Sequence, residues 1–193
     1  LASPFYLSSG IHSACMSSLP PPFFIGSRVS EDPVSAPRPL RLAWLFFWIA
    51  VVAAVAALGA AFPPDAWYAE LRKPTFNPPA WLFAPVWTTL YLMMAVSAWM
   101  VILEPGIPAR VRRIALSLMG VQLALNALWT PLFFGLHAPG LAFLDICALW
   151  AAVLATIFAF AAVRPLASWL LAPYIVWVSF ALVLNGSIWL MNR

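Results

Sequence analysis

Long apolar stretches separated by short polar connections dominate the sequence from residue 42 onward. Each stretch is near or above the roughly 20 residues that a helix needs to cross about 30 Å of hydrocarbon. Backbone groups in lipid must be satisfied within their own segment, and the alternation typical of membrane β-strands is absent. The pattern predicts an all-α membrane protein, a bundle of five transmembrane helices at about 42–62, 81–103, 112–134, 140–163 and 166–191.

Residues 1–40 have a different pattern. They are rich in Ser and Pro and contain no apolar run long enough to span a membrane or to serve as a signal peptide. We therefore expect a disordered N-terminal extension over 1–40, for which Met16 is an alternative start, followed by a transmembrane domain over 41–193.

The composition excludes a soluble enzyme. Hydrophobic residues make up 64% of the chain and charged residues only 8%, whereas soluble domains carry about 25% charged residues. The net charge of +4 includes no long basic run, so we expect no nucleic-acid partner. Cys15 and Cys147 form no CxxC pair, and His12 and His137 have no second ligand nearby, so we expect no metal site.

Basic residues suggest an orientation in the membrane. Seven lie on the side of the N-terminal segment and the second and fourth connections, whereas three lie on the opposite side. If this is a bacterial inner-membrane protein, the bias predicts a cytoplasmic N-terminus. The seven are Arg28, Arg38, Arg41, Arg110, Arg112, Arg113 and Arg164, and the three are Arg72, Lys73 and Arg193.

The longest connection, about residues 63–80, is stiffened by proline and loaded with aromatic residues. Such a loop is poorly suited to be a passive tether. It is either a lid on the helix bundle or an anchor at the headgroup level, and the sequence favours neither. Its prolines are Pro63, Pro64, Pro74, Pro78 and Pro79, and its aromatic residues are Trp67, Tyr68 and Phe76.

A second group of residues is polar or aromatic and lies deep in the predicted spans. Helical spacing places Gln122, Asn126 and Trp129 on one face of the third span, and the topology brings further residues to the same half of the membrane. Trp177 lies roughly 20 Å from the end of its helix on the side of the 63–80 connection, too deep for an ordinary interfacial tryptophan. The further residues are Trp87, Tyr91, Ala181, Leu184 and Asn185.

Two interpretations of these residues compete. In one, the amides only cross-link helices by hydrogen bonds while the aromatic rings pack. In the other, which we favour for the set, they line an aromatic pocket for a flat, largely apolar ligand. Asp145 is a candidate functional carboxylate, although a structural role such as accepting a hydrogen bond from the loop is equally compatible. The spans contain no recognisable catalytic constellation.

Three motifs in register resemble the TspO/MBR family, which comprises the translocator proteins, also called peripheral-type benzodiazepine receptors. The motifs are WYAELRKPTFNPPAWLFAPVWTTLY at 67–91, QLALNALWTPLFFG at 122–135 and PYIVWVSFALVLNGSIW at 173–189. The likeness covers about residues 42–192 and suggests a bacterial member. It implies a five-helix bundle, commonly a homodimer, whose cavity is closed by the first long loop.

The resemblance also implies a function. Family members bind porphyrins such as protoporphyrin IX, many bind cholesterol and drug-like ligands, and proposed roles include tetrapyrrole handling and stress response. The implied ligand-binding residues are Trp87, Tyr91, Asn126, Trp129, Trp177, Ala181 and Leu184, and the implied lid residues are Trp67, Lys73, Pro74, Pro78 and Pro79. We expect a porphyrin ligand, no required cofactor, and a sensor or handling protein in the bilayer. Photochemical porphyrin degradation and passive transport of porphyrin or sterol are the alternatives.

Two departures from the family pattern bear on ligand choice. Gly186 and Leu190 replace the tyrosine and the basic residue of the animal cholesterol motif, so recognition of cholesterol through that motif is not expected. Leu141 stands where animal members carry a tryptophan, so we expect weaker binding of drug-like ligands that stack there.

Overall fold

The computed structural model describes residues 37–193, and these residues contain helices and no strand. The long helices are α1 (Arg38–Ala60), α3 (Phe83–Leu103), α4 (Ala109–Thr130), α5 (Pro139–Ala161) and α7 (Ala172–Met191). Shorter elements are α2 (Ala66–Glu70), the 3₁₀ turn η1 (Ala80–Leu82), the π-turn η2 (Pro131–Gly135) and α6 (Pro165–Trp169).

Five segments of this structure are long and apolar enough to cross a membrane, which confirms a multi-pass integral membrane protein. They are Arg38–Ala60, Ala80–Ile102, Ala109–Gly135, Pro139–Ala161 and Pro165–Met191. The boundaries lie within a few residues of those predicted. The first helix begins at Arg38, inside the stretch assigned to the N-terminal extension, and the rest of that assignment lies outside the described residues.

Proline sets where most of the helices begin. Pro139 and Pro165 occupy first-turn positions, while Pro37 and Pro108 directly precede α1 and α4. The proline ring fixes φ near the helical value, and the amide that proline lacks would be unpaired in the first turn anyway. The chain is therefore prepared to enter each span immediately after a connection.

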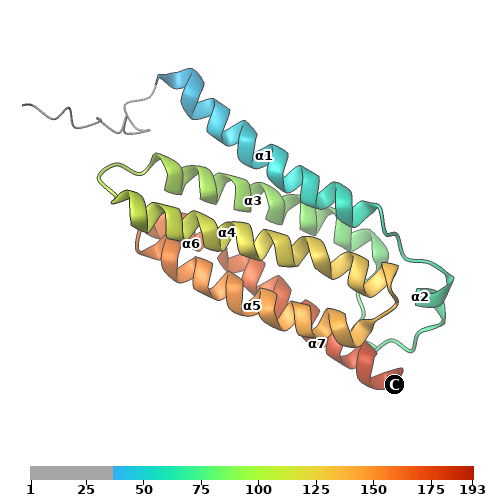
Figure 1. The fold of residues 1–193 in the computed structure, drawn as a ribbon. Coiled ribbons are helices and arrows are strands. Elements are labelled where there is room, and N and C mark those ends of the chain that lie inside the picture. The colour runs from blue at the N-terminus through green and yellow to red at the C-terminus, as the bar shows by residue number, and fades with distance from the viewer. Residues whose placement is uncertain (1–36) are drawn as a thin grey trace, which may run out of the picture. The chain divides into compact units, whose positions relative to one another are not determined.

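The helices pack mainly as neighbours: α4 lies against α5, α5 against α7, and α1 against α3 and α4 (Figure 1). α1 buries only Trp48 and Val52, so most of its surface faces outward. The larger core cluster lies among α3, α4, α5 and α7, and a smaller one forms where the first loop meets the ends of α5 and α7. This second cluster places the loop beside the residues described next.

Candidate functional site

A hydrogen-bonded chain of side chains joins α3, α4 and α7 inside the bundle. The Tyr91 hydroxyl donates to Asn126 Oδ1 at 2.8 Å, and Asn126 Nδ2 donates to the Tyr174 hydroxyl oxygen at 3.3 Å. Trp87 lies against both tyrosines, with ring centroids 5.3 Å from Tyr91 and 6.3 Å from Tyr174. Asn126 is thus the centre of an aromatic cluster, with its amide oxygen and nitrogen both bonded within the bundle.

A second polar link lies nearer to the first loop. Trp129 Nε1 donates to Asn185 Oδ1 at 2.9 Å, and Asn185 Nδ2 donates to the carbonyl oxygen of Pro139 at 2.9 Å. The indole of Trp129 also stacks on Phe133, with centroids 5.1 Å apart. One buried amide therefore connects α4, α5 and α7, while the tryptophan it holds packs toward the loop.

The π-turn at the end of α4 accounts for the position of Phe133. Pro131 has no amide hydrogen, so the ordinary helical ladder is interrupted there. The amide of Leu136 instead donates to the Pro131 carbonyl, five residues back, at 2.8 Å. A π-turn of this kind shifts the following side chains around the helix axis. Phe133 is buried, and its ring contacts Trp67 and Tyr68 of the first loop.

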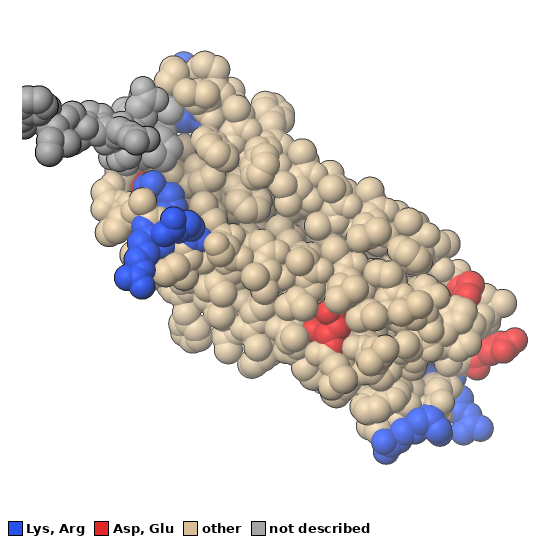
Figure 2. Space-filling view, viewed as in Figure 1, with Lys and Arg blue, Asp and Glu red and all other residues tan. Residues whose placement is uncertain are grey.

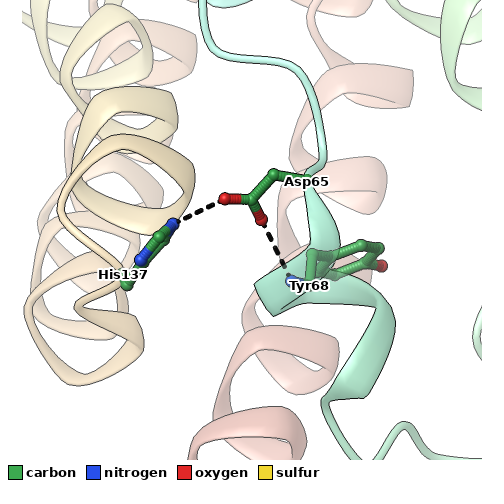
Figure 3. A network of polar contacts seen from close by, with 3 residues as sticks. All are labelled: Asp65, Tyr68 and His137. Carbon is green, nitrogen blue, oxygen red and sulfur yellow. Dashed lines mark hydrogen bonds and ion pairs between the residues drawn. The ribbon is translucent and has the colours of Figure 1, made fainter.

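The short helix α2 fastens the first loop to the connection between α4 and α5. Asp65 caps α2 by accepting the Tyr68 amide at 3.1 Å, and its other carboxylate oxygen lies 2.9 Å from His137 Nε2 (Figure 3). His137, at φ 49°, also stacks on Trp67 with centroids 4.3 Å apart. The Tyr68 amide, and to a smaller extent His137, lower the pKa of Asp65 below its ordinary value of 3.8.

The middle of the same loop is attached to Asn192, the residue that follows α7. Arg72 N donates to Asn192 Oδ1 and Asn192 Nδ2 donates to Arg72 O, both at 2.9 Å. Lys73 Nζ donates to the carbonyls of Ala69 and Leu71 and lies 4.4 Å from the centre of the Tyr68 ring. These contacts hold the loop across the ends of the helices.

The predicted lid prolines shape the second half of the loop. The Pro74 carbonyl accepts the amide of Asn77 at 3.0 Å and so closes a tight turn. Pro79 directly precedes η1, which leads into α3. Between them Phe76 contacts Phe180 of α7, with centroids 6.3 Å apart.

An open groove of 970 Å³ runs between α3 and the α6–α7 segment. Trp177 forms part of its wall and packs on Phe83 and Phe180, with centroids 5.9 and 5.6 Å apart. The other lining residues are apolar except Thr89, namely Leu82, Pro85, Val86, Leu90, Met93, Trp169, Ala172 and Pro173, with Val176. The groove thus combines an aromatic wall with an opening on the outside of the bundle.

The predicted ligand-binding residues occupy one region of the protein, but in separate layers. Trp87, Tyr91 and Asn126 form the inner cluster, whereas Trp177 lies at the groove. Ala181 packs against the larger core cluster, and Leu184 is buried in the smaller one beside Trp129 and Trp67. The hydrogen bonds of Asn126 and Asn185 join side chains and backbone of neighbouring helices.

Two residues that the sequence interpretation omitted belong to the site. Tyr174 is fully buried in the inner cluster, and its position three residues before Trp177 places both on one helical face, a signal available in the sequence. The position of Phe133 depends on the π-turn, for which Pro131 is the only indication in the sequence. Asp145 is 7% exposed, and neither carboxylate oxygen has a hydrogen-bond partner in the described part of the chain, so a bond from the loop is not formed.

The fold and these contacts define a class: a five-span membrane protein with an aromatic interior closed at one end by a fastened loop. The TspO/MBR family profile matches residues 47–190. Protein CrtK of Rhodobacter capsulatus is 41% identical over 140 residues, which cover 72% of this chain and 87% of CrtK. The chain belongs to the TspO/MBR family.

Other relatives come from bacteria and animals. The tryptophan-rich sensory protein of Cereibacter sphaeroides is 37% identical over 148 residues, 76% of this chain and 90% of that protein. The human translocator protein is 41% identical over 127 residues, 66% of this chain and 75% of that protein. The names of these relatives refer to sensing and to translocation.

Proposed function

We propose that this protein binds porphyrin-class tetrapyrroles, and similar flat hydrophobic molecules, beside Trp177 in the groove between α3 and α7. The observation that carries the proposal is the apolar groove of 970 Å³ with an indole in its wall. Small-molecule sites occupy roughly 300–1,000 Å³ and are mostly apolar with a few polar groups. The groove is therefore large enough for a flat macrocycle.

The chemistry of the groove favours an extended conjugated ligand. Flat rings gain from offset or edge contacts with an indole in addition to the apolar area that they bury. Trp177, Phe83 and Phe180 offer such faces together. Because the groove opens outward from the spans, a ligand dissolved in the bilayer reaches it without crossing an aqueous phase.

The inner cluster supports the groove rather than supplying polar contacts to the ligand. Asn126 already bonds Tyr91 and Tyr174, so a ligand that inserted there would have to break two hydrogen bonds. Such bonds are worth about 0.6 kcal/mol on average in a membrane protein. We therefore propose selection by shape and apolar area, with affinity that changes little when a peripheral polar substituent of the ligand is altered.

The role that follows is sensing or handling of tetrapyrroles, without a required cofactor. It is in keeping with the name of the sensory protein of Cereibacter sphaeroides, and no acid pair or nucleophile–base pair takes part in the groove. The alternative role is photochemical degradation of bound porphyrin. It is tested under illumination by comparing the decay of porphyrin absorbance in the complex with the decay in micelles that contain free tryptophan. Passive transport is measured by porphyrin flux into proteoliposomes.

Binding is tested by quenching of tryptophan fluorescence when protoporphyrin IX is added to the protein in detergent micelles. We expect saturable quenching in the wild type and an affinity at least several-fold weaker in Trp177→Leu. The matched control is Trp44→Leu, because Trp44 lies at the opposite end of the spans. Unchanged affinity in Trp177→Leu would assign the quenching to porphyrin dissolved in the micelle, and an equal loss in both variants would show no preference for the groove; either result would contradict the proposal.

A further inference from the structure

A second open pocket, of 470 Å³, lies at the end of the bundle opposite the first loop. It is formed where α1, the end of α3 and the beginning of α4 meet. Its apolar wall consists of Trp44, Ile102 and Leu116, and its polar edge consists of Arg112, Arg113 and Ser117, with Ala109 of the first turn of α4 beside them. A pocket with one apolar and one cationic side at the end of a span suits an amphipathic anion.

One hydrogen bond holds the Arg112 side chain in place, and its guanidinium keeps further N–H groups that can donate. Its Nη2 donates to the carbonyl oxygen of Glu104 at 2.6 Å, which fixes the plane of the guanidinium. Its Nε is buried and has no hydrogen-bond partner in the described chain. Because Nε has almost no exposed surface, the donors that remain for a ligand in the pocket are the other N–H groups of the guanidinium. A phosphate oxygen is the acceptor that a guanidinium binds best.

The nearby carboxylate does not neutralise this edge. Glu104 pairs with Arg164 at 3.3 Å, and neither Arg112 nor Arg113 forms an ion pair with a carboxylate of the described residues. The start of α4 follows Pro108 without a side-chain cap, so its free amides and helix dipole add to the positive potential.

Charge is distributed unequally between the two ends of the spans. Figure 2 shows basic side chains at both ends of the spans, with acidic side chains near those of the loop end. Over residues 37–193 this end carries six basic residues and one acidic residue, whereas the loop end carries three basic and two acidic residues. The former are Arg38, Arg41, Arg110, Arg112, Arg113 and Arg164 with Glu104, and the latter are Arg72, Lys73 and Arg193 with Asp65 and Glu70.

From these features we infer that the pocket is a binding site for the headgroup of an anionic phospholipid. The phosphate is bound by the guanidinium groups of Arg112 and Arg113, with the Ser117 hydroxyl as a further donor, and the acyl chains lie along the apolar wall. Trp44, 39% exposed, presents its indole at the boundary where headgroup and chains meet. A lipid is the favoured occupant, since a free anion would leave the apolar wall uncovered. This site is independent of the tetrapyrrole groove.

The test is native mass spectrometry of the full chain in detergent with added lipid. The probes are phosphatidylglycerol and phosphatidylcholine with identical acyl chains, which differ in net charge. We expect the wild type to retain phosphatidylglycerol several-fold more than phosphatidylcholine. Arg112→Gln with Arg113→Gln should remove that preference. Arg72→Gln with Arg193→Gln, which changes the charge equally at the other end, should keep it.

A further variant and two outcomes distinguish binding of the phosphate in this pocket from attraction of the lipid by diffuse positive charge. Arg112→Lys keeps the charge but lacks the forked guanidinium donors, so it should lose much of the preference while its circular dichroism stays that of the wild type. If the control double variant loses the preference as fully as the site variant, diffuse charge explains the binding and the inference fails. It fails as well if soluble glycerol phosphate competes at the same concentration as the lipid, since the acyl wall would then contribute nothing.

Discussion

The amide of Asn185 offers a quantitative test of how α4, α5 and α7 are held together. This side chain is 2% exposed and makes two hydrogen bonds, one from Trp129 Nε1 and one to the Pro139 carbonyl, both at 2.9 Å. Intramembrane hydrogen bonds contribute about 0.6 kcal/mol on average and up to about 1.7 kcal/mol. Asn185→Ala should therefore lower the free energy of unfolding by about 1–3 kcal/mol.

The measurement is unfolding in mixed micelles with increasing sodium dodecyl sulfate, followed by helical circular dichroism. Trp129→Phe is the partner variant, because it removes the indole N–H and keeps an aromatic ring beside Phe133. In a double-mutant cycle the two substitutions should show a coupling of about 0.5–1.5 kcal/mol, since they remove the same bond. Strictly additive effects, or an Asn185→Ala protein as stable as the wild type, would refute the proposed cross-link.

Three further predictions follow from local geometry. In Gly186→Ala the new methyl would lie 2.9 Å from the Phe143 ring, which should lower the free energy of unfolding by about 1–2 kcal/mol. Gly120 has open space around it, so Gly120→Ala should raise the free energy of unfolding by about 0.5–1 kcal/mol in the same assay. Folding lowers the pKa of Asp65, so the stabilisation of the loop by its carboxylate is complete above about pH 4 and is lost as the pH falls through the lowered pKa. Amide-exchange protection of 65–70 should therefore drop in the wild type only at such low pH. In Asp65→Ala the protection should be reduced at any pH. Ala172→Phe should narrow the groove and weaken protoporphyrin IX binding several-fold in the quenching titration, an expectation that unchanged affinity would contradict.

Much of the fold follows directly from the sequence. The five spans were predictable because lipid requires long apolar runs, and the prolines at 37, 108, 139 and 165 mark where helices begin. α1 begins at Arg38, a few residues before the predicted span, because Arg38 and Arg41 interrupt the apolar run although both are compatible with helix.

The candidate site was predictable only in part. Helical spacing indicates that Asn126 and Trp129 share one helix face, and it likewise places Tyr174 on the same face as Trp177. Spacing along one helix does not tell which polar groups on different helices bond one another. The contact between Asp65 and His137, 72 positions apart, depends on how the loop closes over the bundle, and no local pattern encodes it.

A tetrapyrrole site between α3 and α7 can be located by light-activated cross-linking with a diazirine-bearing protoporphyrin analogue, followed by peptide mapping. We expect labels on 82–93 and 169–180 that unmodified protoporphyrin IX competes away and that Trp177→Leu reduces. Labels that spread over the outward surface of α1, or that excess protoporphyrin IX does not displace, would contradict the proposed site.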